Sequence, residues 1–151
     1  MELFQEFFQN RVLFAAVLAW LVAQILKVLL EWLLHKRLSA ERLWGAGGMP
    51  SAHSAMVCAL TVSMARFYGV SSPVFALSVM FSFVTIYDAM GVRRETGEHA
   101  RLLNKYLKQM KSQDDDDLSP EIDLKEYIGH TPMEVLAGVL LGILVGVLIP
   151  A

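Results

Sequence analysis

The chain has 151 residues, enough for one domain, and 55% of them are hydrophobic. Soluble domains are about 45–50% apolar even when glycine is counted, so this composition favours an integral membrane protein over a soluble one. The single cysteine, Cys58, excludes a disulfide framework within the chain. The net charge of −2 says little about partners, and we expect no nucleic-acid partner.

Four apolar stretches are candidates for membrane-crossing helices. They cover residues 12–34, 52–68, 74–90 and 133–149, and a bilayer core requires about 17–25 mostly apolar residues. The start of the chain is acidic and lacks the basic leader and cleavage site of a secretory signal, so we expect the first helix to be retained. The predicted fold is an all-α membrane bundle of four spans in one domain, residues 1–151.

Polar and small residues recur at helical spacing within these stretches. Gln24, Lys27 and Glu31 share one face of the first helix, which must therefore contact protein or water. Small-residue stripes, which let membrane helices approach closely, occur on the second and fourth helices. They are Ala55, Ala59 and Ser63, and Gly138, Gly142 and Gly146. We expect both stripes to serve packing within the bundle, and one of them to be available for a homodimer.

The segment 91–131 between the third and fourth stretches is polar. Residues 92–112 form a basic, amphipathic pattern that predicts a cytoplasmic helix along the inner membrane surface, in contact with membrane lipids. Four consecutive aspartates, Asp114–Asp117, follow. Adjacent acids without glycine or spaced partners fit neither a calcium loop nor a zinc site, so we expect a solvated loop, with no metal and no cofactor.

The positive charges predict an orientation. Ten of the 13 Lys and Arg residues lie in the segments 34–51 and 91–131, which four spans would place on one side. Because positively charged loops stay in the cytoplasm, we expect both segments inside and both termini outside, in a bacterial-type inner membrane.

Four spans would also bring chemically useful side chains to the cytoplasmic end. They are Lys27, Ser51, His53, Asp88, Arg93, Arg94, His130 and Glu134. Cations and free N–H groups at helix starts neutralise a phosphate, while imidazoles supply a nucleophile and a general acid. This pattern predicts a phosphate site.

Several of these residues also have a structural interpretation. Glu134 follows Thr131 and Pro132 in a helix-capping pattern, and Ser51 could only cap its own helix. Asp88 could pair with Arg93 or Arg94 as a structural ion pair, and Lys27 could pair with Glu31.

Three motifs together resemble a known superfamily. PSAH, residues 50–53, is similar to the PSGH motif of the type-2 phosphatidic acid phosphatases and vanadium-dependent haloperoxidases, and HTPME, residues 130–134, is similar to their later His-x3-Asp. With YDAMGVRRETGEHA, residues 87–100, the combination resembles the small, divergent branch of that superfamily. Two positions depart from it, because Asp123 and Leu124 stand where the superfamily has Ser-Arg, and no Lys-x6-Arg-Pro follows Lys27.

The resemblance implies a phosphatase that acts on a lipid phosphate or pyrophosphate. His130 would be the nucleophile, His53 the general acid, and Glu134 would orient and stabilise His130. Lys27, Ser51, Arg93 and Arg94 would bind phosphate, with Asp88 in support. The alternative is a catalytically silent membrane protein that binds phosphate or anionic lipid, or a small transporter or assembly factor.

Overall fold

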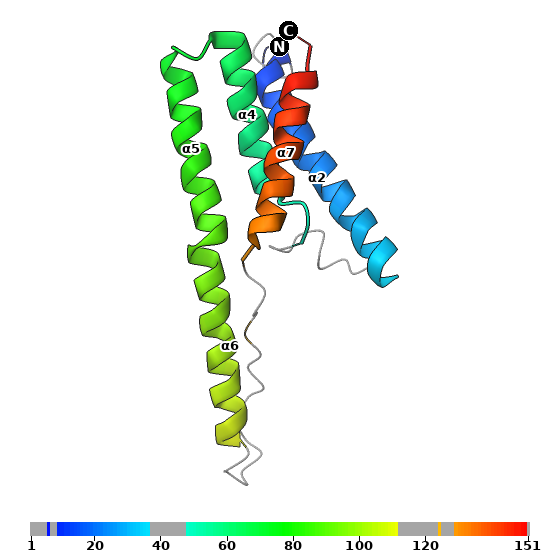
Figure 1. The fold of residues 1–151 in the computed structure, drawn as a ribbon, viewed down its shortest axis with the longest axis vertical. Helices are drawn as coiled ribbons and strands as arrows, with labels where there is room; N and C mark the ends of the chain where they lie inside the picture. Colours follow the sequence, from blue (N-terminus) through cyan, green and yellow to red (C-terminus); the bar gives the residue numbers. More distant parts are fainter. Residues whose placement is uncertain (1–5, 7–8, 37–47, 112–123, 125–128, 151) are drawn as a thin grey trace.

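The computed structural model describes residues 6, 9–36, 48–111, 124 and 129–150. Within them the chain forms only helices (Figure 1). They are α2 (Arg11–His35), α4 (Ala52–Tyr68), α5 (Pro73–Met90), α6 (Val92–Lys111) and α7 (Pro132–Leu148). Four of them match the predicted apolar stretches to within one residue at each end. The prediction of an all-α bundle is confirmed. The solvated loop predicted at Asp114–Asp117 lies outside the described residues.

The helices α2, α4, α5 and α7 each begin after a residue whose side chain accepts free N–H groups of the first turn. Asn10 Oδ1 accepts from Val12 and Leu13 at the start of α2, at 3.1 and 3.0 Å. Ser51 caps α4 and Ser72 caps α5, which has Pro73 in its first turn. The helix bounds therefore follow from local sequence.

The helices α2, α4 and α7 pack together as the core of the bundle. Their contact is built from alanines, and Ala23, Ala55 and Ala59 are fully buried. The two small-residue stripes face each other between α4 and α7. A Cβ at Gly142 would meet the carbonyl oxygen of Ala55, and one at Gly146 would lie 2.8 Å from Val62 Cβ. Since each stripe is covered within one chain, a homodimer would have to use another face.

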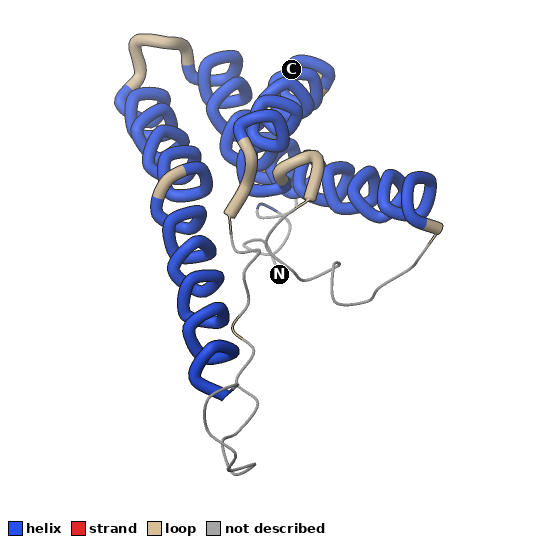
Figure 2. The backbone as a smooth tube through the Cα atoms, turned by 60° about the horizontal axis from the view of Figure 1, so that its bottom comes forward, coloured by secondary structure: helices blue, strands red, loops and turns tan. Residues whose placement is uncertain are grey.

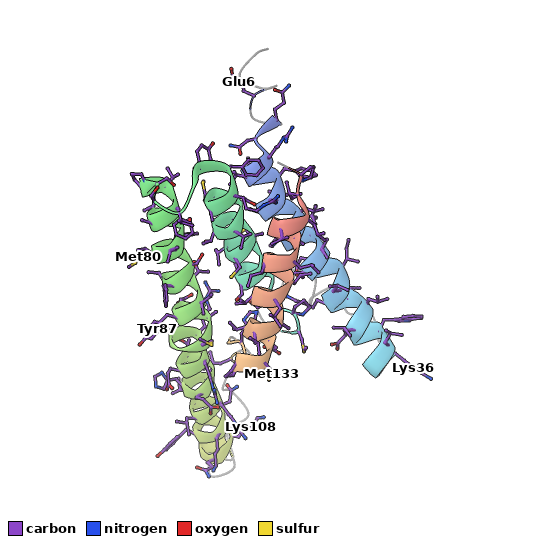
Figure 3. All side chains as sticks on the ribbon, turned by 45° about the horizontal axis from the view of Figure 1, so that its top comes forward. Glu6, Lys36, Met80, Tyr87, Lys108 and Met133 are labelled. Atoms are coloured by element: carbon purple, nitrogen blue, oxygen red, sulfur yellow. The ribbon has the colours of Figure 1, made fainter. Side chains whose placement is uncertain are left out.

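Helix α5 lies at the edge of this core and contacts mainly α4. Hydroxyl groups join the two helices, because Thr61 Oγ1 lies 2.8 Å from Ser82 Oγ and Ser82 Oγ donates to the Val57 carbonyl at 3.1 Å. On the opposite face of α5, Met80 and Tyr87 point away from the other helices (Figure 3) and are exposed. A large apolar surface of this kind is typical of a helix that contacts lipid.

Within the described part of the chain, two helical regions are long and apolar enough to cross a membrane. They are residues 11–33 and the run 73–109 that contains α5 and most of α6, while α7 is a shorter apolar helix. The predicted amphipathic helix is present as α6. It continues along the direction of α5 beyond the core, as Figures 1 and 2 show, instead of turning across it. A helix lying on the membrane surface would cross α5 at a large angle, so α6 does not have the expected surface orientation here.

Helix α6 has one buried face. Gly97, Ala100 and Asn104 are buried on that face. The Asn104 side chain bonds both backbone groups of Leu124, donating to its carbonyl at 2.8 Å and accepting from its N–H at 3.0 Å. This contact holds Leu124 against α6.

Candidate functional site

Three segments that are distant in sequence meet where α4 and α7 begin and α5 ends. The N–H of Ser51 donates to the carbonyl of Glu134 at 2.9 Å, and the N–H of His130 donates to the carbonyl of Ala89 at 3.1 Å. These two backbone bonds join the starts of α4 and α7 to the last turn of α5. They place the residues around both predicted histidines at one end of the bundle.

His130 is almost completely buried, with 3% of its surface exposed. Neither ring nitrogen has a hydrogen-bond partner among the described residues. Buried polar atoms in folded proteins are nearly always paired, and the exceptions are often at functional sites. The unpaired imidazole makes His130 a candidate for contact with a ligand.

Burial lowers the pKa of His130 below the ordinary histidine value. The carboxylate of Glu134 acts in the opposite direction, whereas the positive charges of Lys27, His53 and Arg93 lower this pKa further. Because the ordinary value is about 6.5, the imidazole is neutral at pH 7. A neutral imidazole has a lone pair available for nucleophilic attack.

Lys27 reaches the same region from α2 and is buried, with 6% exposed. Its aliphatic stem packs on Gly48, where an added Cβ would lie 3.3 Å from Lys27 Cγ and Cδ. Gly48 also has φ +88°, which favours glycine. The ammonium group of Lys27 interacts electrostatically with the carboxylate of Glu134. The sequence analysis missed Gly48, although a glycine pair one residue before PSAH signals a close backbone approach.

Glu134 forms the capping box that the sequence indicated. Its Oε2 accepts the N–H of Thr131 at 2.9 Å, and its own N–H donates to Thr131 Oγ1 at 3.4 Å. It makes no hydrogen bond to His130, whose ring nitrogens have no partner among the described residues. The structure therefore gives Glu134 a capping contact and a charge that acts on His130 and Lys27, but not the orienting bond expected from the resemblance.

Ser51 is fully buried and caps α4. Its Oγ accepts from the N–H of Ser54 at 3.4 Å and from Ser54 Oγ at 2.9 Å. His53, in the first turn of α4, is exposed. Its imidazole interacts electrostatically with Arg93, Lys27 and Asp88 and therefore belongs to the same cluster. His53 is on the exposed side of this cluster, whereas His130 is buried.

Arg93 and Asp88 form an ion pair beside the histidines, with Arg93 Nε donating to Asp88 Oδ2 at 2.6 Å. The charge of Arg93 acts on both His53 and His130. Both arginines are exposed, but the charge of Arg94 is not among those that influence the pKa of His130. Its backbone instead supports Gly129, where an added Cβ would lie 2.7 Å from Arg94 N.

The described residues contain no group of three or more His, Cys, Asp or Glu side chains that could hold a metal ion. The cluster instead combines two imidazoles with the cations of Lys27 and Arg93. That donor set suits an anion, because cations and N–H groups neutralise oxyanions directly.

Apolar helices of membrane length, with a buried histidine and cations at one end, define a helical membrane protein with a candidate anion site. Residues 8–145 match the divergent PAP2 family, and the chain belongs to that family. It is also 36% identical over 148 residues to the "Uncharacterized membrane protein YuiD" of Bacillus subtilis (strain 168), an alignment that covers 90% of this chain and 94% of that protein. No solved structure matches the chain. The resemblance inferred from the three motifs is confirmed.

Proposed function

We propose that this membrane protein is a metal-independent phosphatase that acts on a lipid phosphate or pyrophosphate, with His130 as nucleophile and His53 as general acid. One observation carries the proposal. A buried, neutral imidazole has both nitrogens unpaired among the described residues and lies beside a buried lysine, in a chain of the divergent PAP2 family. Packing alone would favour an apolar residue at such a position.

The proposed reaction has two steps. A nitrogen of His130 attacks phosphorus, forming a P–N bond as the P–O bond to the lipid breaks, and His53 donates a proton to the leaving oxygen. Water then attacks the phosphohistidine while His53 accepts its proton, which releases phosphate and restores neutral His130. Lys27 and Arg93 neutralise the phosphoryl oxygens. The Glu134 charge stabilises the imidazolium formed in the first step.

The alternative is a silent protein that binds phosphate or anionic lipid. One observation favours it. Leu124, which is bonded through its backbone to Asn104, stands in place of the superfamily arginine and supplies no positive charge. The cluster would then bind an anion without turning it over.

Phosphate release separates the two functions. Purified protein in detergent is expected to release inorganic phosphate from at least one member of a panel of lipid monophosphates and diphosphates. Vanadate, which adopts the geometry of the phosphoryl transition state, should inhibit this release, and a metal chelator should not. Binding of phosphate without release from any lipid would favour the silent protein, and absence of both binding and release would end both proposals.

We also propose that the site faces the cytoplasm, as the positive charges predict. In a variant lacking Cys58, a cysteine in place of exposed His99 of α6 should react with a membrane-impermeant maleimide only after the cells are opened. A cysteine in place of exposed Ser71, in the turn between α4 and α5 at the other end, should react in intact spheroplasts. Labelling of the two positions in the reverse order would invert the orientation.

A further inference from the structure

The ion pair between Asp88 and Arg93 depends on a break in the helix. Residues five apart in a continuous α-helix lie about 140° apart around the axis and do not face each other. At Gly91 the backbone leaves the helical conformation, with φ −101° and ψ −84°, between the end of α5 and the start of α6. The break allows Arg93 to reach back to Asp88, at 2.6 Å.

The same break holds the segment that carries His130. The carbonyl of Ala89 accepts the N–H of His130 at 3.1 Å, and Gly129 packs closely on the backbone of Arg94. Residues 88–94 therefore contact the nucleophile segment on both sides of the break. This is why the charge of Arg93 acts on His130 as well as on His53.

The contact leaves most of the guanidinium available. Only Nε of Arg93 donates to Asp88, and Nη1 and Nη2 make no hydrogen bond to any other residue that the structure describes. A guanidinium has five N–H donors and binds phosphate oxygens in pairs. The two side chains are 45% and 40% exposed, and ion pairs this open to solvent contribute little to stability. A purely structural explanation of the pair is therefore weak.

We propose that Asp88 is a positioning residue, which holds the Arg93 guanidinium by Nε at the entrance of the site so that its terminal N–H groups receive the substrate phosphate. The inference rests on the proposed function for the identity of the anion. Asp88 itself does not contact phosphate, since its negative charge would repel it. Its effect on binding therefore depends entirely on Arg93.

A double-mutant cycle tests this dependence. The affinities for inorganic phosphate and for vanadate are measured for the wild type, Asp88→Asn, Arg93→Lys and the double variant. Asp88→Asn should bind each anion about tenfold more weakly than the wild type, the order expected for coupled contacting groups. The double variant should bind each anion as tightly as Arg93→Lys alone. Lysine keeps the charge but lacks the Nε group that Asp88 holds. Equal losses in both backgrounds, or tighter binding by Asp88→Asn, would overturn the inference.

A matched control lies on α6, away from the site. There Glu98 and Arg101 form an exposed ion pair, with 4.0 Å between Glu98 Oε2 and Arg101 Nη1. Glu98→Gln should leave phosphate affinity unchanged, and Asp88→Asn should unfold at the same temperature as Glu98→Gln. Coupling between Asp88 and Arg93 without lipid phosphate release by the wild type would refute the proposed function alone. If the wild type releases phosphate from a lipid but the losses of anion affinity in Asp88→Asn and Arg93→Lys are additive, the positioning role alone is refuted. A wild type that binds neither phosphate nor vanadate would refute both proposals.

Discussion

Replacing His130 with alanine is expected to abolish release of phosphate from lipid phosphates, with a loss of about 10⁴-fold or more in kcat, as is typical when a covalent nucleophile is removed. In the proposed mechanism His53 has the separate role of general acid, so it does not replace the nucleophile. His53→Ala should lose less, about 10²- to 10⁴-fold, since a general acid assists leaving-group departure without forming the covalent bond.

The control for this prediction is His99→Ala, because His99 is an exposed histidine of α6. The His99→Ala protein should release phosphate as fast as the wild type. Acid-quenched reactions with radiolabelled substrate should also show an acid-labile, base-stable phosphoryl group on the wild-type chain and none on His130→Ala. Because His130 is buried, the helix content and unfolding temperature of each variant must be compared. A folded His130→Ala protein that retains turnover would exclude the nucleophile role.

The second large effect is expected from Gly142→Leu, which should lower the free energy of unfolding by about 3 kcal/mol or more, at the upper end of the usual cost of overpacking. At this position even a Cβ would meet the Ala55 carbonyl oxygen and lie 2.8 Å from Cys58 Cβ. The helices α4 and α7 would have to separate, and with them the segments that carry His53 and His130. Gly142→Ala should also lower the free energy of unfolding, but by a smaller amount.

Unfolding in mixed detergent, followed by helix content, measures this difference. Ala76→Leu provides the matched control, because Ala76 is exposed on α5 and a leucine there adds the same side chain without meeting another helix. Its unfolding should match that of the wild type. If Gly142→Leu were equally stable, the close approach of α4 and α7 would be wrong.

Much of the fold could be predicted because its signals are local. Apolar length, the capping residue Ser51 and the Thr131 to Glu134 pattern predicted where helices begin, and the structure has them there. Asn10 and Ser72 cap α2 and α5 through equally local contacts. The direction of α6 could not be predicted, because it depends on the backbone at Gly91 and on the contact of Asn104 with Leu124.

The candidate site shows the same division. A common membrane level predicted that Lys27, His53 and His130 would approach one another, but it could not separate the exposed imidazole from the buried one. Nor could it show that Arg93 takes part while Arg94 supports Gly129. Adjacent residues on a helix point about 100° apart, so which of them faces the site depends on what the helix packs against.

The sequence by itself determined the membrane character of the chain, its family, the positions of its helices and the residue types that could bind and transfer a phosphate. These follow from composition, periodicity and motifs, which act over a few neighbouring residues. Only the tertiary structure decided that the two small-residue stripes face each other, that His130 is buried without a hydrogen-bond partner among the described residues, and that Asp88 holds Arg93. Such contacts join residues far apart along the chain or across a helix break, and they depend on how whole helices pack.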